Sequence, residues 1–264
     1  MNLKYGNLGK PKRISNCRLR APTIPACDEI PRCMNLLALE TSAETASVAL
    51  LTGGDTIFRE GGTPGTHARF VLPWVEELLA ESGLALGRLD GIAFSAGPGS
   101  FTGLRLAVSV AQGLALGAGL PVVAVPTLEA LALAAGDGFR FCCVDARMSE
   151  VYSAAFEVAG EEVRACSPVD VGAPAQLAGP DEGHASWHGC GSGFSLEAVR
   201  MLPWIAGLAS VDAGLAAHAR NIARLGAVAM KAGKAMDPAL AAPLYVRDKV
   251  ARTTAERLMA GGRA

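Results

Sequence analysis

The segment SAGPGSFTGLRLAVSVAQG, residues 95–113, constrains the fold of this chain more than any other stretch. Its glycines, Gly97, Gly99 and Gly103, lie between an apolar run typical of a buried strand and an apolar run with helical spacing. Glycine at such a junction permits positive φ angles and lets another group approach the backbone closely. The free amides of a first helical turn also favour a bound anion by about 0.3–1 kcal/mol. The segment therefore predicts an α/β fold and leaves two interpretations open, a phosphate-binding loop and a tight strand–helix turn.

The spacing of these glycines departs from the common nucleotide-binding motifs. The pattern is GxGxxxG, whereas a P-loop has the pattern GxxxxGK[ST], and no lysine follows the glycines here. A dinucleotide-binding unit places an aspartate or glutamate at the end of the next strand, but that strand, PVVAVPT, ends without one. Phosphate binding is therefore supported by the loop alone and by neither motif.

The helix predicted at 101–119 is apolar on both of its long sides. The stripe expected to face the core consists of Leu104, Ala107, Val108, Ala111 and Leu114. The opposite side carries Leu106, Val110, Gly113, Leu116 and Gly117, interrupted by Arg105, Ser109 and Gln112. Such a helix is either wholly buried in its own chain or packs against another protein, and its small residues would allow a second helix to approach closely. Both interpretations are open at this stage.

Strand and helix patterns before residue 136 predict a first β-meander followed by helix-linked strands. Three short strands are expected within 35–60, and a helix within 66–82, where Pro73 kinks the helix or delays its start. Strands follow at 89–97 and 120–126. Thr127 is expected to cap a helix that ends at Gly136.

A second meander begins after the GDG sequence at 136–138. Less regular elements follow it: a strand near 185–188, a short helix at 195–201 and a long helix at 213–231. Two meanders in one chain predict two related halves. The expected segments are a leader at 1–33, an N-terminal lobe at 34–136 that binds a partner, a C-terminal lobe at 137–250 and a flexible tail at 251–264.

Charge is unevenly distributed along the 264 residues. Residues 1–33 hold 7 of the 24 basic residues and 2 of the 25 acidic ones, so they carry +5 and the remainder −6. With four prolines and no apolar periodicity, this leader is expected to be disordered and basic. A transit peptide, an upstream start before Met34 and an RNA-contacting tail are open alternatives. The overall charge of −1 gives no sign of a nucleic-acid-binding surface.

Cysteine use and hydropathy indicate the compartment. The chain has seven cysteines and no CxxC pair, which fits free thiols in a reducing cytoplasm. Glycine, proline or charged residues interrupt every apolar run that approaches membrane-spanning length, so no membrane segment is expected. The adjacent Cys142 and Cys143 fall in a predicted strand, where their side chains would point to opposite faces.

Four segments resemble the TsaB family, the dimerisation subunit of the bacterial machinery that makes threonylcarbamoyladenosine on tRNA. They are LLALETSAETASVAL, the glycine segment with its flanking strands, VDARMSEVY and PLYVR, in that order, and the resemblance runs from Met34 to about Arg247. It implies a two-lobed α/β fold of the actin/Hsp70/sugar-kinase-like (ASKHA) type, each lobe built on a β-meander.

The resemblance also implies a chain that is not catalytic on its own. In the catalytic relative TsaD an HxxxH motif binds metal, and Thr127 and Leu131 stand at the matching positions here, so no metal site is expected. A different histidine pair, His184 and His188, falls in a glycine-rich segment that does not favour a metal site. His67, at the start of a predicted helix, is expected to cap or pack.

By the same comparison, the set of residues that binds nucleotide in this fold is incomplete, because Glu40 occupies the position at which the fold normally has aspartate. The residues assigned to nucleotide or phosphate binding are Glu40, Thr41, Ser42, Gly97, Gly99, Ser100 and Gly103. Asp145 and Arg147, in the second hairpin, are interpreted either as a structural turn pair or as part of a site.

Partner binding is assigned to the N-terminal lobe, through helices near 66–82 and 101–118. The assigned interface residues are Phe70, Trp74, Arg105, Leu106, Val110, Gly113, Leu116 and Gly117. The implied partners are a TsaD-like catalytic subunit and a TsaE-like ATPase, with tRNA contacted only through the complex and a homodimer when the partner is absent. A charge at Val110 or Leu116 is expected to abolish pairing and leave the monomer folded.

No cofactor is expected for the chain alone. ATP and magnesium would act in the complex, with a nucleotide at the subunit interface as an open possibility. The competing hypothesis is a small-molecule kinase or nucleotide-hydrolysing enzyme of the same fold, using Glu40 and the loop from Gly97 to Gly103.

Overall fold

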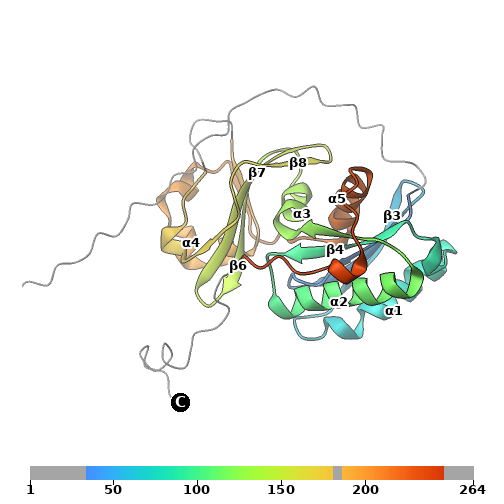
Figure 1. Ribbon diagram of the computed structural model, residues 1–264. Coiled ribbons are helices and arrows are strands. Elements are labelled where there is room, and N and C mark those ends of the chain that lie inside the picture. The colour runs from blue at the N-terminus through green and yellow to red at the C-terminus, as the bar shows by residue number, and fades with distance from the viewer. Residues whose placement is uncertain (1–33, 181–185, 247–264) are drawn as a thin grey trace, which may run out of the picture.

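The computed structural model describes residues 34–180 and 186–246, which form two mixed β-sheets with helices between and beside them (Figure 1). The first sheet has the order β3-β2-β1-β4-β5, and the second the order β11-β10-β6-β7-β8, with β9 paired to β7. The two-lobed α/β fold expected from the sequence is therefore confirmed. The leader at 1–33, the tail at 251–264 and His184 lie outside the described residues.

The first sheet contains the meander predicted within 35–60. Its strands are β1 (Leu36–Glu40), β2 (Ala46–Thr52), β3 (Asp55–Gly61), β4 (Gly91–Gly97) and β5 (Val122–Pro126). Strands β1 to β3 pair antiparallel, whereas β4 lies parallel to both β1 and β5. Because β1 and β4 run in the same direction, the turn after β1 and the glycine loop after β4 emerge at the same edge of the sheet.

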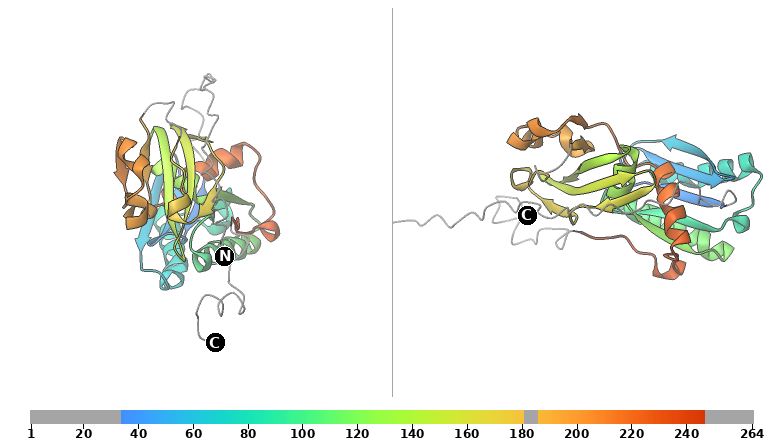
Figure 2. Two further views of the ribbon diagram at one scale, coloured as in Figure 1. Left: turned by 90° about the vertical axis from the view of Figure 1, so that its left-hand side faces the viewer. Right: turned by 90° about the horizontal axis from the view of Figure 1, so that it is seen from above.

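Helices cover both faces of the first sheet. On one face lie α1 (Val71–Ser82) and α2 (Phe101–Ala118), whose buried residues share a core with β1, β2 and β4. On the other face lie α3 (Thr127–Ala134) and α5 (Ala219–Lys231), which pack between the two sheets (Figures 1 and 2). Pro73 delays the start of α1 as predicted, since the 3₁₀-helix η1 (His67–Arg69) precedes it.

The second sheet contains the second predicted meander. Its strands are β6 (Gly138–Arg147), β7 (Glu150–Ala159), β8 (Glu162–Ala165), β9 (Asp170–Gly172), β10 (His188–Cys190) and β11 (Ser210–Asp212). Helix α4 (Glu197–Arg200) and the short 3₁₀-helices η3 (Pro174–Gln176), η4 (Ser192–Ser195) and η5 (Pro203–Gly207) also belong to this half. Cys142 packs in the core between the sheets and Cys143 in the core on the outer face, so the predicted opposite orientation is confirmed.

Two local expectations were wrong. Thr127 does not cap α3: it is the first helical residue, and its hydroxyl accepts a hydrogen bond from the amide of Gly97 (3.1 Å). The long helix begins at Ala219, not 213, because the Asp212 carboxylate accepts hydrogen bonds from two following amides and holds a turn. His218 then caps α5 by accepting from the amide of Arg220.

Helix α5 follows the second meander in the sequence but packs on β1, β2 and β4 of the first sheet. The chain therefore returns to its first half after building the second. The segment boundaries drawn from the sequence stay predictions.

Helix α2 is, among the described residues, the one helix long and apolar enough by length and composition to cross a membrane. No membrane segment was expected from the sequence. A third of its 18 residues are buried, and these form the stripe that contacts the first sheet. Helices that pack against a core commonly have this composition, so the finding is weak support for a membrane span.

Candidate functional site

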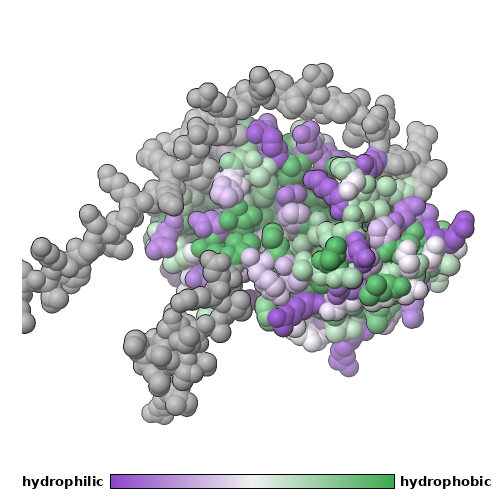
Figure 3. Space-filling model, in the orientation of Figure 1, coloured by the Kyte–Doolittle hydropathy of each residue, from purple (hydrophilic) through white to green (hydrophobic). Residues whose placement is uncertain are grey.

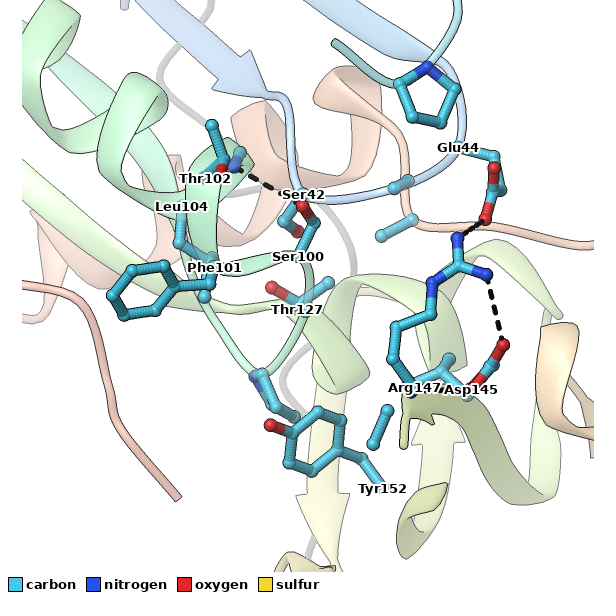
Figure 4. A pocket seen from close by; sticks show the side chains of 18 of the residues that line it. Ser42, Glu44, Ser100, Phe101, Thr102, Leu104, Thr127, Asp145, Arg147 and Tyr152 are labelled. Atoms are coloured by element: carbon cyan, nitrogen blue, oxygen red, sulfur yellow. Dashed lines mark hydrogen bonds and ion pairs between the residues drawn. The ribbon is translucent and has the colours of Figure 1, made fainter. Parts of the chain in front are cut away.

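A cavity of about 530 Å³ lies between the two halves of the molecule (Figure 4). Its walls come from the turn after β1 (42–44), the glycine loop and first turn of α2 (98–104), the tip of the β6–β7 hairpin (144–148) and the last described residues (244–246). The volume lies within the usual range for small-molecule sites. The cavity is therefore the place at which to test the nucleotide-binding residues assigned from the sequence.

The glycines of the loop are required by the protein's own chain. A Cβ atom on Gly99 would lie 2.7 Å from the Cβ of Ser42, and one on Gly103 would lie 2.0 Å from the carbonyl oxygen of Thr41. The Thr41 hydroxyl donates to the Gly103 carbonyl at 2.6 Å. Gly97 has φ +118°, and a Cβ there would lie 2.9 Å from the Leu244 carbonyl oxygen. Close packing explains all three glycines, which favours the tight strand–helix turn over the phosphate-binding loop.

Amides of the loop are also bonded within the chain. The amide of Ser100 donates to the Ser42 carbonyl at 3.0 Å, and the amide of Gly103 donates to the Ser100 hydroxyl, the N-cap of α2, at 3.4 Å. The amide of Gly97 donates to Thr127. The Ser100 and Gly97 amides hold the loop against the turn after β1 and against α3, and the Gly103 amide closes the first turn of α2, so these three donors are not available to a phosphate.

Glu40 is fully buried beneath the cavity and does not line it. Its Oε1 accepts hydrogen bonds from the hydroxyl of Ser42 (2.7 Å) and the amide of Ala43 (3.1 Å), as well as from the amide of Ser42. Burial raises the pKa of this carboxyl, and the hydrogen bonds from Ser42 oppose that rise. The geometry gives Glu40 a structural role in the turn after β1, and its assigned contact with phosphate stays a prediction.

The second hairpin contributes the charged wall of the cavity. Arg147 forms ion pairs with Asp145 (3.3 Å) and, across the cavity, with Glu44 of the first half (2.6 Å) (Figure 4). Three consecutive residues at the hairpin tip, Arg147, Met148 and Ser149, have positive φ. Arg147 is the only lysine or arginine among the lining residues, and both of its acidic partners also lie in the wall. An added polyphosphate would therefore meet two carboxylates and a cation that is already paired.

The three histidines that the structure describes show no arrangement suited to catalysis or metal binding. His67 is buried, and its two ring nitrogens lie 3.2 Å from the carbonyl oxygens of Thr41 and Glu44, so it packs under the first turn as expected. His188 contacts the Ser210 hydroxyl at 2.7 Å. Within 34–180 and 186–246, no cluster of three or more potential metal ligands is found.

Some of the assigned interface residues on α1 and α2 are exposed, and others pack against the core. Phe70, which precedes α1 and is 37% exposed, stacks on Trp74 within α1. Leu116 of α2 is 61% exposed. Gly113, Gly117 and Arg105 are exposed, whereas Leu106 and Val110 are half-buried against the core. A Cβ on Gly113 or Gly117 would meet no atom within 4 Å. The structure thus brings Phe70, Arg105, Gly113, Leu116 and Gly117 to the exposed surface of α1 and α2, whereas Leu106 also lines the cavity.

Two sets of contacts were missed by the sequence reasoning. Leu244 and Tyr245 of the PLYVR motif reach the glycine loop and α2, and Glu44 pairs with Arg147 although 103 residues separate them. PLYVR is distinctive in the sequence, but its position against α2 is set by the path of the chain after α5.

Comparison with known proteins places these features in a family. A family model for TsaD, described as tRNA N6-adenosine threonylcarbamoyltransferase, matches residues 63–255. The tRNA threonylcarbamoyladenosine biosynthesis protein TsaB of Haemophilus influenzae is 45% identical over 135 residues, which are 50% of this chain and 56% of that protein. The TsaB protein of Escherichia coli is 41% identical over 128 residues, 47% of this chain and 55% of that protein. The chain thus spans about half the length of the curated relatives it matches.

A solved structure extends the similarity over the whole fold. It is a Pseudomonas aeruginosa protein described as uncharacterized, with similarity to peptidase YEAZ. It is 37% identical to this chain, has a TM-score of 0.73, and is matched over 81% of this chain and 100% of its own. A second structure, described as YeaZ from the same organism, gives a TM-score of 0.72 at 36% identity.

Proposed function

Because the chain belongs to the TsaB family, we propose that it is a non-catalytic subunit that pairs with a TsaD-like catalytic subunit. The relatives are named as biosynthesis proteins for tRNA threonylcarbamoyladenosine. In the proposed complex, the partner transfers the threonylcarbamoyl group to N6 of the adenosine next to the anticodon, and this chain contacts tRNA only through that partner.

The observation that carries the proposal is the outward face of α2. The buried stripe of α2 packs on the first sheet, and the exposed side carries Gly113, Gly117 and the largely exposed Leu116 among polar residues such as Arg105 and Ser109. Glycine inside a helix costs about 0.5–1 kcal/mol relative to alanine. Gly113 and Gly117 are spaced four residues apart on this face, and no atom of residues 34–180 or 186–246 requires their small size. A partner helix in close contact would supply the missing reason for both.

Independent catalysis has little support from the residues of the cavity. The glycine loop is filled by Thr41, Ser42 and Leu244, and Glu40 is held by the turn that follows it. These residues do not fit a magnesium–ATP complex, so we assign ATP and magnesium to the complex, through a TsaE-like ATPase. A nucleotide at the subunit interface and a homodimer without the partner are compatible with this arrangement. We place the protein in the cytoplasm, apart from membranes.

The test is reconstitution with the TsaD-like and TsaE-like proteins of the same organism. The full chain should co-purify with the TsaD-like protein, and threonylcarbamoyl transfer to tRNA should require all three proteins. Loss of this requirement would contradict the proposal. Transfer by this chain without the TsaD-like protein would also contradict it.

Calorimetric titration of the isolated chain with magnesium–ATP distinguishes the proposed function from the alternative, a small-molecule kinase or nucleotide-hydrolysing enzyme. The proposed function predicts no heat of binding and no phosphate release. Micromolar binding with turnover would favour the kinase.

A further inference from the structure

The last described segment, residues 236–246, wraps from one face of the first sheet to the other, and we name it the C-terminal strap. It leaves α5, and Met236 pairs with Val122 of the edge strand β5 through two backbone hydrogen bonds, 2.8 and 3.0 Å long. The 3₁₀-helix η6 (Pro238–Leu240) then lies against α2 (Figures 1 and 2). The strap therefore covers an exposed sheet edge and ends beside the helix assigned to partner binding.

Several side chains of α2 hold the strap. The Gln112 amide donates to the carbonyl oxygens of Pro238 (2.8 Å) and Ala241 (3.4 Å). Nearer the start of α2, the Arg105 guanidinium lies 4.0 Å above the ring of Phe101 and donates to the Tyr245 hydroxyl at 3.4 Å. The strap thus follows α2 back from its middle to its N-terminus.

The same strap forms one wall of the cavity. The amide of Leu244 donates to the carbonyl of Ala96 at 2.7 Å, and the Leu244 carbonyl occupies the space that a side chain at Gly97 would need. Leu244, Tyr245 and Val246 all line the cavity. A displacement of this short stretch would therefore change the cavity wall and the glycine loop together.

The outer part of the strap is weakly held. Leu240 is 72% exposed and Tyr245 51% exposed, and Tyr245 is tied to α2 by one long hydrogen bond and a ring contact with Phe101. Hydrophobic residues are visible over this region of the first half in Figure 3, among polar ones. Segments with few buried contacts shift or open at low free-energy cost. A protein that covered α2 would adjoin this segment.

We propose that the C-terminal strap couples partner binding on α2 to the state of the cavity between the two halves. The inference rests on the proposed function, because the partner is the TsaD-like protein. Docking on the outward face of α2 presses the strap against Arg105 and Phe101, which fixes Leu244 on the glycine loop and narrows the opening opposite Arg147. By reciprocity, whatever fills the cavity changes the affinity for the partner by the same factor.

Hydrogen exchange measured by mass spectrometry, on the full chain with and without the TsaD-like protein, tests this coupling. In the wild type, partner binding should slow exchange in α2 and also, by about fivefold or more, at 144–148 on the far wall of the cavity. Tyr245→Ala removes the contacts with Arg105 and Phe101 and changes no residue of α2 itself. This variant should keep the protection of α2 and lose the change at 144–148.

Met201→Ala is the matched control, since it removes an exposed hydrophobic side chain in the second half and should behave as the wild type. Protection of α2 without any change at 144–148 in the wild type would overturn the coupling alone. So would an equal change at 144–148 in Tyr245→Ala. Absence of protection at α2 in the wild type would overturn the proposed function, and the coupling with it.

Discussion

Replacement of Gly113 and Gly117 by alanine should have opposite effects on the monomer and on pairing. Both glycines lie inside α2, neither has a positive φ, and a Cβ on either would meet no atom within 4 Å. Alanine should therefore stabilise the isolated helix by about 0.5–1 kcal/mol at each site. The double variant should gain about 1–2 kcal/mol. For a chain of this size that corresponds to a rise in Tm of about 2–8 °C.

Pairing should respond in the other direction. If a partner helix packs against the bare backbone at these positions, two added methyl groups overpack the contact and cost about 1–3 kcal/mol. That cost is a loss of about 5- to 150-fold in affinity. Thermal unfolding of the isolated chain measures the first effect, and calorimetric titration with the TsaD-like protein measures the second.

An exposed alanine elsewhere supplies the control. Ala206, in η5 of the second half, is exposed, and Ala206→Gly should leave the affinity for the partner unchanged. Unchanged affinity of the double variant, together with a higher Tm, would refute the reasoning, because the glycines would then have no contact to make. A lower Tm would show that the glycines are packed within the monomer.

Three further predictions follow from burial and exposure. Leu116→Asp should weaken pairing by about 30-fold or more and leave Tm almost unchanged, because Leu116 is 61% exposed. Val110→Asp should also destabilise the fold, because Val110 packs against the core. Equal losses of Tm for the two variants in thermal scans would contradict this prediction. Burial raises the pKa of Glu40 above 4.5, so the folded state binds its proton more tightly than the unfolded state and the stability linked to it is lost as pH rises through the raised pKa. The stability advantage of Glu40→Gln over the wild type, measured by urea unfolding, should therefore be larger at pH 8 than at pH 4. An equal advantage at both pH values would contradict this prediction. Burial raises the pKa of the Cys143 thiol to about 12 and raises the pKa of Cys142 well above its ordinary value. Neither thiol should therefore react with a thiol reagent at pH 8 in the native protein. Rapid labelling of either cysteine, detected by mass spectrometry, would contradict this prediction.

The sequence by itself determined the elements and their order. Period-two apolar runs separated by turn residues predicted both meanders, and the glycine segment predicted the junction of β4 with α2. The apolar spacing also predicted the buried stripe of α2, but not that Leu106 and Val110 pack against the same core and leave a largely polar exposed side. The predicted features are local, so each could be judged without knowledge of the remaining chain.

Tertiary structure alone decided what the glycine loop is for. The spacing of the glycines in the sequence was compatible with a phosphate bound at Gly99 and Gly103. Only the structure shows that Thr41 and Ser42, which lie about 60 residues earlier in the chain, occupy that space. The hydroxyl of Thr127 was likewise taken by Gly97 and not by its own helix. Local propensity could not anticipate either outcome, because both depend on which distant backbone groups need a partner when β1, β4 and α3 converge.

The path of the chain after α5 was also beyond local reasoning. PLYVR is distinctive as a motif, yet its contacts with Arg105 and the glycine loop exist because Met236 pairs with the edge of β5 and turns the strap back over α2. Long-range pairing of this kind is fixed by the geometry of the whole sheet, which no window of sequence contains.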